Sequence, residues 1–257
     1  MAGASTKVVS ELREGVARIT LNQPPLNILD IPMMVELQNT VRHWGSQKET
    51  KVLVIAHRGK AFSAGVSIQD HTPDKVEKML ETFHGVFRLL DSLSLPTVAL
   101  VDGMALGGGC ELAIFCDLVL ASERATFGQP EIKVGVFPPV AAVLFPRLVG
   151  RNRALELLMT GETVTASEAG HMGLINRVFA TESFREKSEE FLRTLTSLSA
   201  PVLKLTKRVV DLGRYMSFSA GLAAAEQIYL RELMQTEDAR EGLQAFLEKR
   251  RPVWKDH

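Results

Sequence analysis

Short strand-like segments alternate with helical patterns over the first two thirds of this 257-residue chain. Apolar residues recur at helical spacing over residues 31–44 and 74–93. Asp30 before Pro32, and Thr72 before Pro73, are typical of helix starts. The segments that read as strands are residues 16–21, 51–56, 97–101 and 117–121. Strands that alternate with helices predict an α/β fold.

The composition changes after about Ser183, because every later segment has helical periodicity and none has the pattern of a strand. The helices predicted in this last part are residues 184–198, 201–212, 217–234 and 238–249. The sequence therefore predicts an α/β core that is followed by a helical appendage.

The balance of charge argues against broad attraction to nucleic acid or to an anionic membrane, because 30 Lys and Arg residues match 30 Asp and Glu residues. The longest apolar stretches are too short to span a bilayer, and the N-terminal residues have no apolar signal core. We therefore expect a soluble, cytoplasmic protein. Cys110 and Cys116 form no disulfide framework, and the six histidines show no ligand spacing, so no metal site is expected.

Three consecutive glycines, Gly107 to Gly109, stand where the predicted strand 97–101 has ended and a helix over about 108–115 begins. A helix start leaves N–H groups unpaired and carries a partial positive charge, so an anion could approach the backbone there. The alternative is a tight turn with close helix packing, and the glycines alone do not distinguish the two. The segment is not a phosphate loop, because no Gly-Lys-Ser/Thr follows.

A second segment of small residues, KAFSAGVSI at 60–68, follows the predicted strand 51–56. It can offer another backbone N–H at the carboxyl end of a strand, where sites of α/β proteins tend to lie. Together the two segments would supply two backbone donors, which is what the stabilisation of an oxyanion requires.

Two carboxylates stand in apolar surroundings, Glu111 after the glycines and Glu131 in the stretch ATFGQPEIKVGVFPP at 125–139. Glu131 could be an ordinary solvated loop residue. Alternatively, burial and mutual repulsion raise the pKa of one carboxyl towards neutrality, and the pair acts as general acid and base. His84 lies on a predicted helix near Phe83 and Phe87, and we expect it to be partly packed.

These segments carry a resemblance to the crotonase superfamily, the enoyl-CoA hydratases and isomerases, over essentially the full chain. The motifs are AFSAGV, GMALGGGCELAIFCDLVLASERATFGQPEI and EGLQAFLEKRRPVWK. The resemblance implies an α/β spiral of ββα units over residues 1–195 and a C-terminal helical trimerisation region over 196–257. It also implies assembly as a homotrimer or a homohexamer.

The resemblance assigns four residues to the reaction of an acyl-CoA substrate. The backbone N–H groups of Val66 and Gly108 would form the oxyanion hole for the thioester carbonyl. Glu111 and Glu131 match the two carboxylates that activate water and protonate the substrate carbon. Because both are present, the resemblance favours hydration by an enoyl-CoA hydratase-type lyase.

Five further residues match positions that contact coenzyme A in this superfamily. Leu26, Ala64 and Ile68 match positions that border its adenine and pantetheine. Phe246 and Lys249 match positions that reach the CoA of a neighbouring subunit. CoA is part of the substrate, so no separate cofactor is implied.

The chain departs from the common hydratase pattern at three positions. Ser67 stands where Asp is common, and Gln69 stands where a Lys near the CoA phosphates is common. Pro139, in FPPVAAVLF at 137–145, replaces a glycine whose N–H helps to hold the catalytic water. Proline has no N–H, so either another group holds the water or the water lies elsewhere. The apolar residues 141–143 that follow also predict a reshaped acyl pocket, and we count Pro139 among its substrate-binding residues.

The stretches AGVSIQDHTPDKVEKM and GVFPPVAAVL are most similar to cyclohexa-1,5-diene-1-carbonyl-CoA hydratases of anaerobic benzoyl-CoA degradation. That similarity implies hydration of the cyclic diene to 6-hydroxycyclohex-1-ene-1-carbonyl-CoA. The first alternative is a straight-chain enoyl-CoA hydratase of β-oxidation, against which Pro139 counts. An isomerase or hydrolase of the same fold, or a non-catalytic acyl-CoA- or RNA-binding member, is also considered. The two carboxylates argue against a non-catalytic role.

Overall fold

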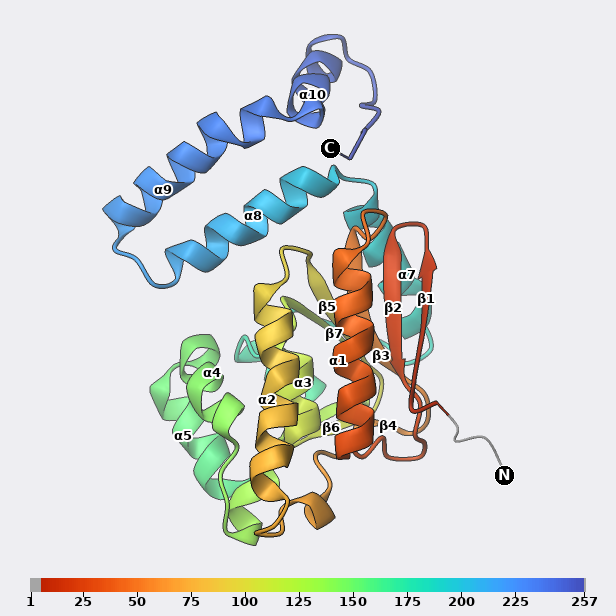
Figure 1. Cartoon of the computed structure of the whole chain (residues 1–257), viewed down its shortest axis with the longest axis vertical. Helices are drawn as coiled ribbons and strands as arrows, with labels where there is room; N and C mark the ends of the chain where they lie inside the picture. Colours follow the sequence, from red (N-terminus) through yellow and green to blue (C-terminus); the bar gives the residue numbers. More distant parts are fainter. Residues whose placement is uncertain (1–5, 257) are drawn as a thin grey trace.

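The computed structural model describes residues 6–256, and two sheets organise its first two thirds (Figure 1). The larger sheet has the order β1-β2-β3-β5-β7-β10, in which β1 and β2 pair antiparallel and the other neighbours pair parallel. Its strands are Val8–Arg13, Val16–Leu21, Val52–His57, Thr97–Val101, Leu118–Ser122 and Arg177–Phe179. The smaller sheet has the order β4-β6-β8-β9, with strands Ala61–Ser63, Met104–Leu106, Thr126–Gly128 and Thr163–Thr165.

The connection between the two sheets repeats along the chain. Three parallel strands of the larger sheet each run into a short strand of the smaller sheet and then towards a helix, as β3-β4-α2, β5-β6-α3 and β7-β8-α4, whereas β2 and β10 run directly into α1 and α7. This repeat is the expected spiral of ββα units, so the predicted α/β architecture is confirmed. The helices of this part are α1 Ile31–Ser46, α2 Val76–Ser92, α3 Gly108–Phe115, α4 Pro139–Val149, α5 Arg151–Thr160, α6 Ala166–His171 and α7 Phe184–Thr196.

The larger sheet is covered on both faces. One face packs on α1, α2 and α3 through the main core, which includes Leu37, Ile55, Phe83 and Ala113. The opposite face packs on α7 through a smaller cluster that includes Val54, Phe184 and Leu192. Two separate apolar layers therefore hold the sheet, and the glycine-rich start of α3 lies in the larger of them.

The C-terminal helices extend away from the sheets, and α8 and α9 form an antiparallel pair in Figure 1. Their bounds are α8 Ala200–Gly213, α9 Phe218–Arg231 and α10 Glu237–Leu247. Each predicted helix of this region is confirmed to within a few residues. The expected boundary between regions at 195/196 falls at the end of α7 and stays a prediction, and residues 1–5 and 257 lie outside the described part.

One expected helix start is confirmed and the other is wrong. The Asp30 carboxylate accepts from the Met33 N–H at 2.9 Å and caps α1. Helix α2 begins at Val76 rather than after Thr72. The Thr72 carbonyl accepts from the N–H groups of Lys75 and Val76, both at 2.9 Å, so residues 72–75 form a turn before the helix. Within residues 6–256 there is no helix with the length and apolar character that a bilayer span needs.

Candidate active site

The segment that carries Val66 is held by a short parallel bridge to residues 26–29. The Leu29 N–H donates to the Gly65 carbonyl at 2.9 Å, and the Ser67 N–H donates to the Leu29 carbonyl at 3.0 Å. Backbone groups of successive residues in such a bridge point in opposite directions, so the Val66 N–H points away from Leu29. This N–H has no protein acceptor within residues 6–256.

The glycine triplet places a second free amide beside the first. The Gly107 N–H donates to the Gly128 carbonyl at 2.9 Å, whereas the Gly108 N–H, at the first position of α3, has no acceptor in the described chain. A Cβ added at Gly65 would lie 3.6 Å from the Gly108 nitrogen, so the two segments touch. The predicted pair of backbone donors is therefore brought together at one helix start.

Each glycine of the triplet is also required by close packing. A Cβ at Gly107, where φ is +51°, would lie 2.5 Å from the Glu131 Oε1. One at Gly108 would lie 2.6 Å from the Val66 Cγ2, and one at Gly109 would lie 2.5 Å from the Ser63 carbonyl oxygen. Tight packing and an unpaired amide at the helix start, left open as alternatives by the sequence, thus occur together.

Glu111 lies in the first turn of α3 and is 2% exposed. Its Oε1 accepts from the Ala141 N–H at 2.8 Å, at the start of α4. Burial, followed by the negative charge of Glu131, raises the pKa of Glu111 to about 7, although the N–H groups of Ala141 and Val140 oppose the rise. A carboxyl with this pKa can take or give a proton at neutral pH.

Glu131 lies on the 3₁₀ helix η2 Pro130–Val134 and is half-buried, so the reading of a solvated loop residue is wrong. Burial raises the pKa of its carboxyl. The fully buried Gln129 side chain lies next to it. With its amide oriented to satisfy both groups, the Gln129 nitrogen lies 3.2 and 3.3 Å from the two carboxylate oxygens of Glu131. Gln129 was not predicted as a site residue, although a polar residue between Gly128 and Pro130 was the available signal.

Pro139 occupies the first position of α4 and has no N–H to offer. The amide of Ala141, two positions after Pro139, donates to Glu111 instead, and the backbone of Val140 also lowers the pKa of this carboxyl. The start of α4 can therefore still hold a carboxylate although Pro139 has no N–H, because the amide two positions later supplies the hydrogen bond.

A cavity of about 430 Å³ lies between α2, α3, α4 and α8. Its apolar wall consists of Phe87, Leu90, Phe115, Pro139, Val140, Val143 and Leu144. His84 also lines it and is half-buried as expected, with its pKa lowered by burial and then by the charge of Arg88. Pro139 and Val140 directly precede the Ala141 amide that binds Glu111, so this cavity adjoins the carboxylate site. Arg147 and Tyr215 also line the cavity, and Arg147 donates to the Tyr215 hydroxyl at 2.8 Å.

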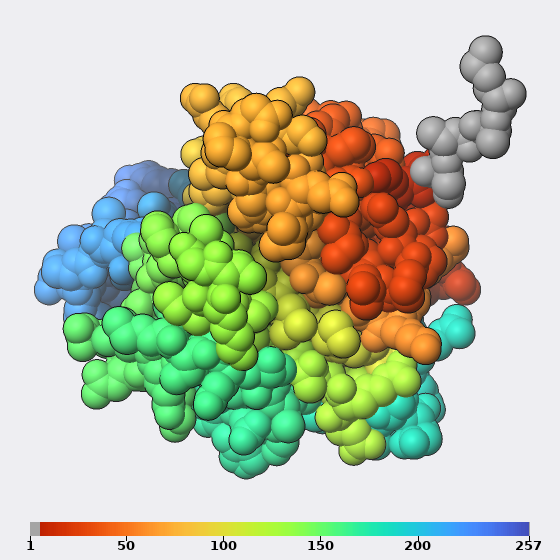
Figure 2. Space-filling model, turned by 90° about the horizontal axis from the view of Figure 1, so that it is seen from below, coloured from red at the N-terminus to blue at the C-terminus, as the bar shows by residue number. Residues whose placement is uncertain are grey.

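The residues expected to border CoA lie near this site but closer to the surface. Leu26 is 40% and Ile68 is 69% exposed, and Ala64 is half-buried. Figure 2 shows the face of the molecule that carries these segments. The gold segment near residues 70–85 and the lime segment near 130–140 lie on two sides of the yellow residues of the β6–α3 region. Helix α10, on which Phe246 is 83% exposed, lies at the end of the molecule away from α3 in Figure 1, and Lys249 follows two residues after it, so one chain does not bring this helix to Glu111.

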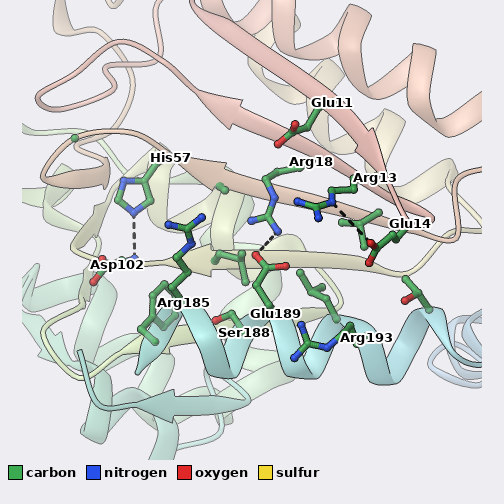
Figure 3. Close-up of a pocket in the computed structure, with 17 residues that line it drawn as sticks. Glu11, Arg13, Glu14, Arg18, His57, Asp102, Arg185, Ser188, Glu189 and Arg193 are labelled. Carbon is green, nitrogen blue, oxygen red and sulfur yellow. Dashed lines mark hydrogen bonds and ion pairs between the residues drawn. The ribbon is translucent and has the colours of Figure 1, made fainter. Parts of the chain in front are cut away.

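A second cavity, of about 530 Å³, lies between the larger sheet and α7 (Figure 3). One ion pair crosses it, between Arg18 of the sheet and Glu189 of α7 at 2.6 Å, while Arg13 contacts the adjacent Glu14 at 3.8 Å. The Asp102 N–H donates to the His57 Nε2 at 3.1 Å. None of the predicted site residues lines this cavity. Within the described chain, no group of three or more His, Cys, Asp or Glu side chains is arranged to hold a metal ion.

Comparisons with known proteins agree on one family. A family model described as "Enoyl-CoA hydratase/isomerase" matches residues 11–257. A "Probable enoyl-CoA hydratase" of Rhizobium meliloti is 36% identical over 248 residues, which cover 95% of this chain and 96% of that protein. The "Cyclohexa-1,5-dienecarbonyl-CoA hydratase" of Thauera aromatica is 33% identical over 255 residues, which cover 99% and 98%. The crystal structure of an enoyl-CoA hydratase from Bacillus anthracis matches with a TM-score of 0.93 at 30% identity, covering 98% of this chain and 100% of that one.

Proposed function

This chain belongs to the enoyl-CoA hydratase/isomerase family and has its fold, and from that premise we propose that it adds water to a conjugated unsaturated acyl-CoA. The expected class of enzyme, an enoyl-CoA hydratase-type hydro-lyase, is confirmed at the level of the family. The observation that carries the proposal is the placement of two carboxylates with raised pKa values, Glu111 and Glu131, beside two unpaired amides.

In the proposed reaction, the thioester carbonyl oxygen accepts from the N–H groups of Val66 and Gly108. Negative charge develops on this oxygen when the hydroxyl of water bonds to the β carbon, and the two donors stabilise it at the start of α3. One glutamate removes the proton of the water and the other delivers a proton to carbon, so that Glu111 and Glu131 share acid and base work. CoA enters as part of the substrate, and the proposed reaction needs no further cofactor.

The substrate we propose is cyclohexa-1,5-diene-1-carbonyl-CoA, which becomes 6-hydroxycyclohex-1-ene-1-carbonyl-CoA. Hydroxyl addition to one ring carbon gives a dienolate, and protonation of the carbon opposite on the ring completes a 1,4-addition. In a straight-chain enoyl thioester the two carbons are neighbours, so the water and the proton donor are needed in different places. Pro139 and the apolar residues that follow it support this substrate. Pro139 removes one N–H donor from the helix start beside Glu111, and the apolar residues line the cavity next to it.

A second candidate is hydration of a straight-chain enoyl-CoA. It is favoured by the Ala141 amide, which donates a hydrogen bond to Glu111 although Pro139 has no N–H. The deciding experiment gives the purified protein the cyclic diene and crotonyl-CoA side by side and identifies the products by chromatography and mass. A large preference in kcat/KM for the diene supports the proposed substrate, whereas efficient hydration of crotonyl-CoA with an inert diene refutes it.

The proposed assembly is a homotrimer or homohexamer, with no nucleic acid or membrane partner, in the cytoplasm. Large apolar side chains are exposed on the C-terminal helices, among them Val210, Leu222, Leu230, Phe246 and Leu247. Such a surface is typical of an interface between copies. We place Phe246 and Lys249 at the CoA of the neighbouring subunit. Sedimentation tests the assembly, and Phe246→Ala is expected to raise KM for acyl-CoA while kcat stays within about threefold.

A further inference from the structure

We propose that Ser63 is a positioning residue that ties together the two backbone segments of the oxyanion hole. The inference rests on the proposed function, because it concerns the amides of Val66 and Gly108. Ser63 is the last residue of β4 and is fully buried. It is the side chain at which the segment before Val66 and the segment after Gly108 meet.

The hydroxyl of Ser63 links the first segment to a fixed point. Its Oγ donates to the Asn27 carbonyl at 2.7 Å and accepts from the Gly65 N–H at 3.1 Å. A serine hydroxyl has one proton to donate, so these two bonds fix its orientation. The Gly65 amide, one residue before Val66, is thereby held in place, in a segment where Gly65 has a φ of +105°.

The Asn27 end of this link is itself anchored by its side chain. Asn27 is fully buried, and its Nδ2 donates to the carbonyls of Arg58 and Ala61, each at 2.8 Å. Its Oδ1 accepts from the Gln23 N–H at 2.8 Å. All three are backbone groups of the protein, so the carbonyl that Ser63 binds is held by a satisfied hydrogen-bond network.

The second segment rests directly on Ser63. A Cβ at Gly109 would lie 2.5 Å from the Ser63 carbonyl oxygen, 2.6 Å from its Cβ and 2.8 Å from its Oγ. The first turn of α3, which begins at Gly108, therefore packs on the same residue that holds Gly65. Oxyanion donors act within a narrow range of distances from the developing charge, so a shift at Ser63 changes the spacing of both donors.

The test compares Ser63→Ala with the matched control Ser188→Ala. Ser188 is 1% exposed on α7, on the other face of the larger sheet, and its Oγ has no hydrogen-bond partner in the described chain. Ser63→Ala is expected to lower kcat by up to about 100-fold, as for a small misplacement of catalytic groups, with KM within about threefold. Ser63→Cys, whose thiol is a weaker donor and acceptor, is expected to have a kcat between those of wild type and Ser63→Ala.

A spectroscopic readout separates positioning from folding. Bound acetoacetyl-CoA ionises to its enolate to the extent that the oxyanion hole stabilises the charge, and the enolate has its own ultraviolet absorbance. We expect wild type and Ser188→Ala to show this band and Ser63→Ala to lose most of it, with unchanged inhibition by free CoA. The positioning role alone would be overturned if Ser63→Ala kept the wild-type kcat and enolate band. It would also be overturned if Ser188→Ala lost as much kcat and as much of the band as Ser63→Ala. A wild type that neither hydrates an enoyl-CoA nor shows the band would overturn the proposed function as well.

Discussion

Gly108→Ala is the substitution whose effect follows most directly from the geometry of the site. The added Cβ would lie 2.6 Å from the Val66 Cγ2 and 2.8 Å from the Phe83 Cζ. Carbon atoms pack at about 3.5–4.0 Å, so both contacts are about 1 Å too short. Phe83 is held edge-on against Phe87 at 4.8 Å between ring centroids, and Val66 is fixed by its bridge to Leu29. The start of α3 and residue 66 must therefore separate.

This separation acts on activity more than on stability. Loss of one oxyanion donor lowers kcat by about 10²–10³-fold, and we expect a fall of this size. Overpacking costs about 1–3 kcal/mol, which corresponds to a decrease in Tm of roughly 2–12 °C for a chain of this length. The measurements are initial rates with the better of the two thioester substrates and a thermal unfolding curve for each variant.

Gly170→Ala is the control, because a Cβ there would meet only the Val178 Cγ2 at an ordinary 3.4 Å. Gly170 lies on α6, and we expect its variant to keep the wild-type kcat and Tm. A Gly108→Ala protein with kcat within threefold of wild type would refute the reasoning, since the Gly108 amide would then not be a donor in the reaction.

Three further results are expected. Glu111→Gln and Glu131→Gln should each lower kcat by about 10²–10⁴-fold in steady-state assays while the protein stays folded, and wild-type rates in either would remove that residue from the reaction. The folded pKa of Glu111 is raised from 4.5 to about 7, so the folded state retains this proton after the unfolded state has lost it. Between these pH values, wild type should lose stability relative to Glu111→Gln as pH rises, by up to about 3 kcal/mol in denaturant titrations, and a constant difference would contradict the raised pKa. Arg18→Met, which breaks the contact with Glu189 in the second cavity, should leave kcat unchanged, and a large loss would place that cavity in the reaction.

Four of the six strands of the larger sheet were predicted, because each has five or six residues and shows a pattern, whereas β1 at Val8–Arg13 and the three-residue β10 at Arg177–Phe179 were not predicted. Residues 16–21 and 97–101 form strands with those bounds, and helix 108–115 begins at Gly108, within the glycine triplet, as expected. The strands of the smaller sheet have three residues each, too few for alternation to appear, and they were not predicted. The turn at Thr72 was mistaken for a helix start because a threonine before proline serves both structures.

The site was predictable as residue types but not as contacts. Glu111 and Glu131 were recognised from their apolar surroundings and from family resemblance. The bond from the Ala141 N–H to Glu111 joins residues 30 apart, and no local pattern encodes it. The direction of the Val66 amide likewise depends on Leu29, which lies on a distant part of the chain. Contacts between residues so far apart in the sequence cannot be predicted from a short window of the chain.

The glycine triplet also limits how this sequence could change over generations. Gly107 is confined by Glu131, Gly108 by Val66 and Phe83, and Gly109 by Ser63. A substitution at Gly107 or Gly108 thus needs compensating changes at different side chains, and the changes that accommodate one glycine do not help the next. Gly109 is more constrained, because the atom nearest to its added Cβ is the backbone carbonyl oxygen of Ser63, which no substitution removes. Few sequences that differ from this one in the glycine triplet are therefore expected to be functional, and a saturation library of paired positions would test this.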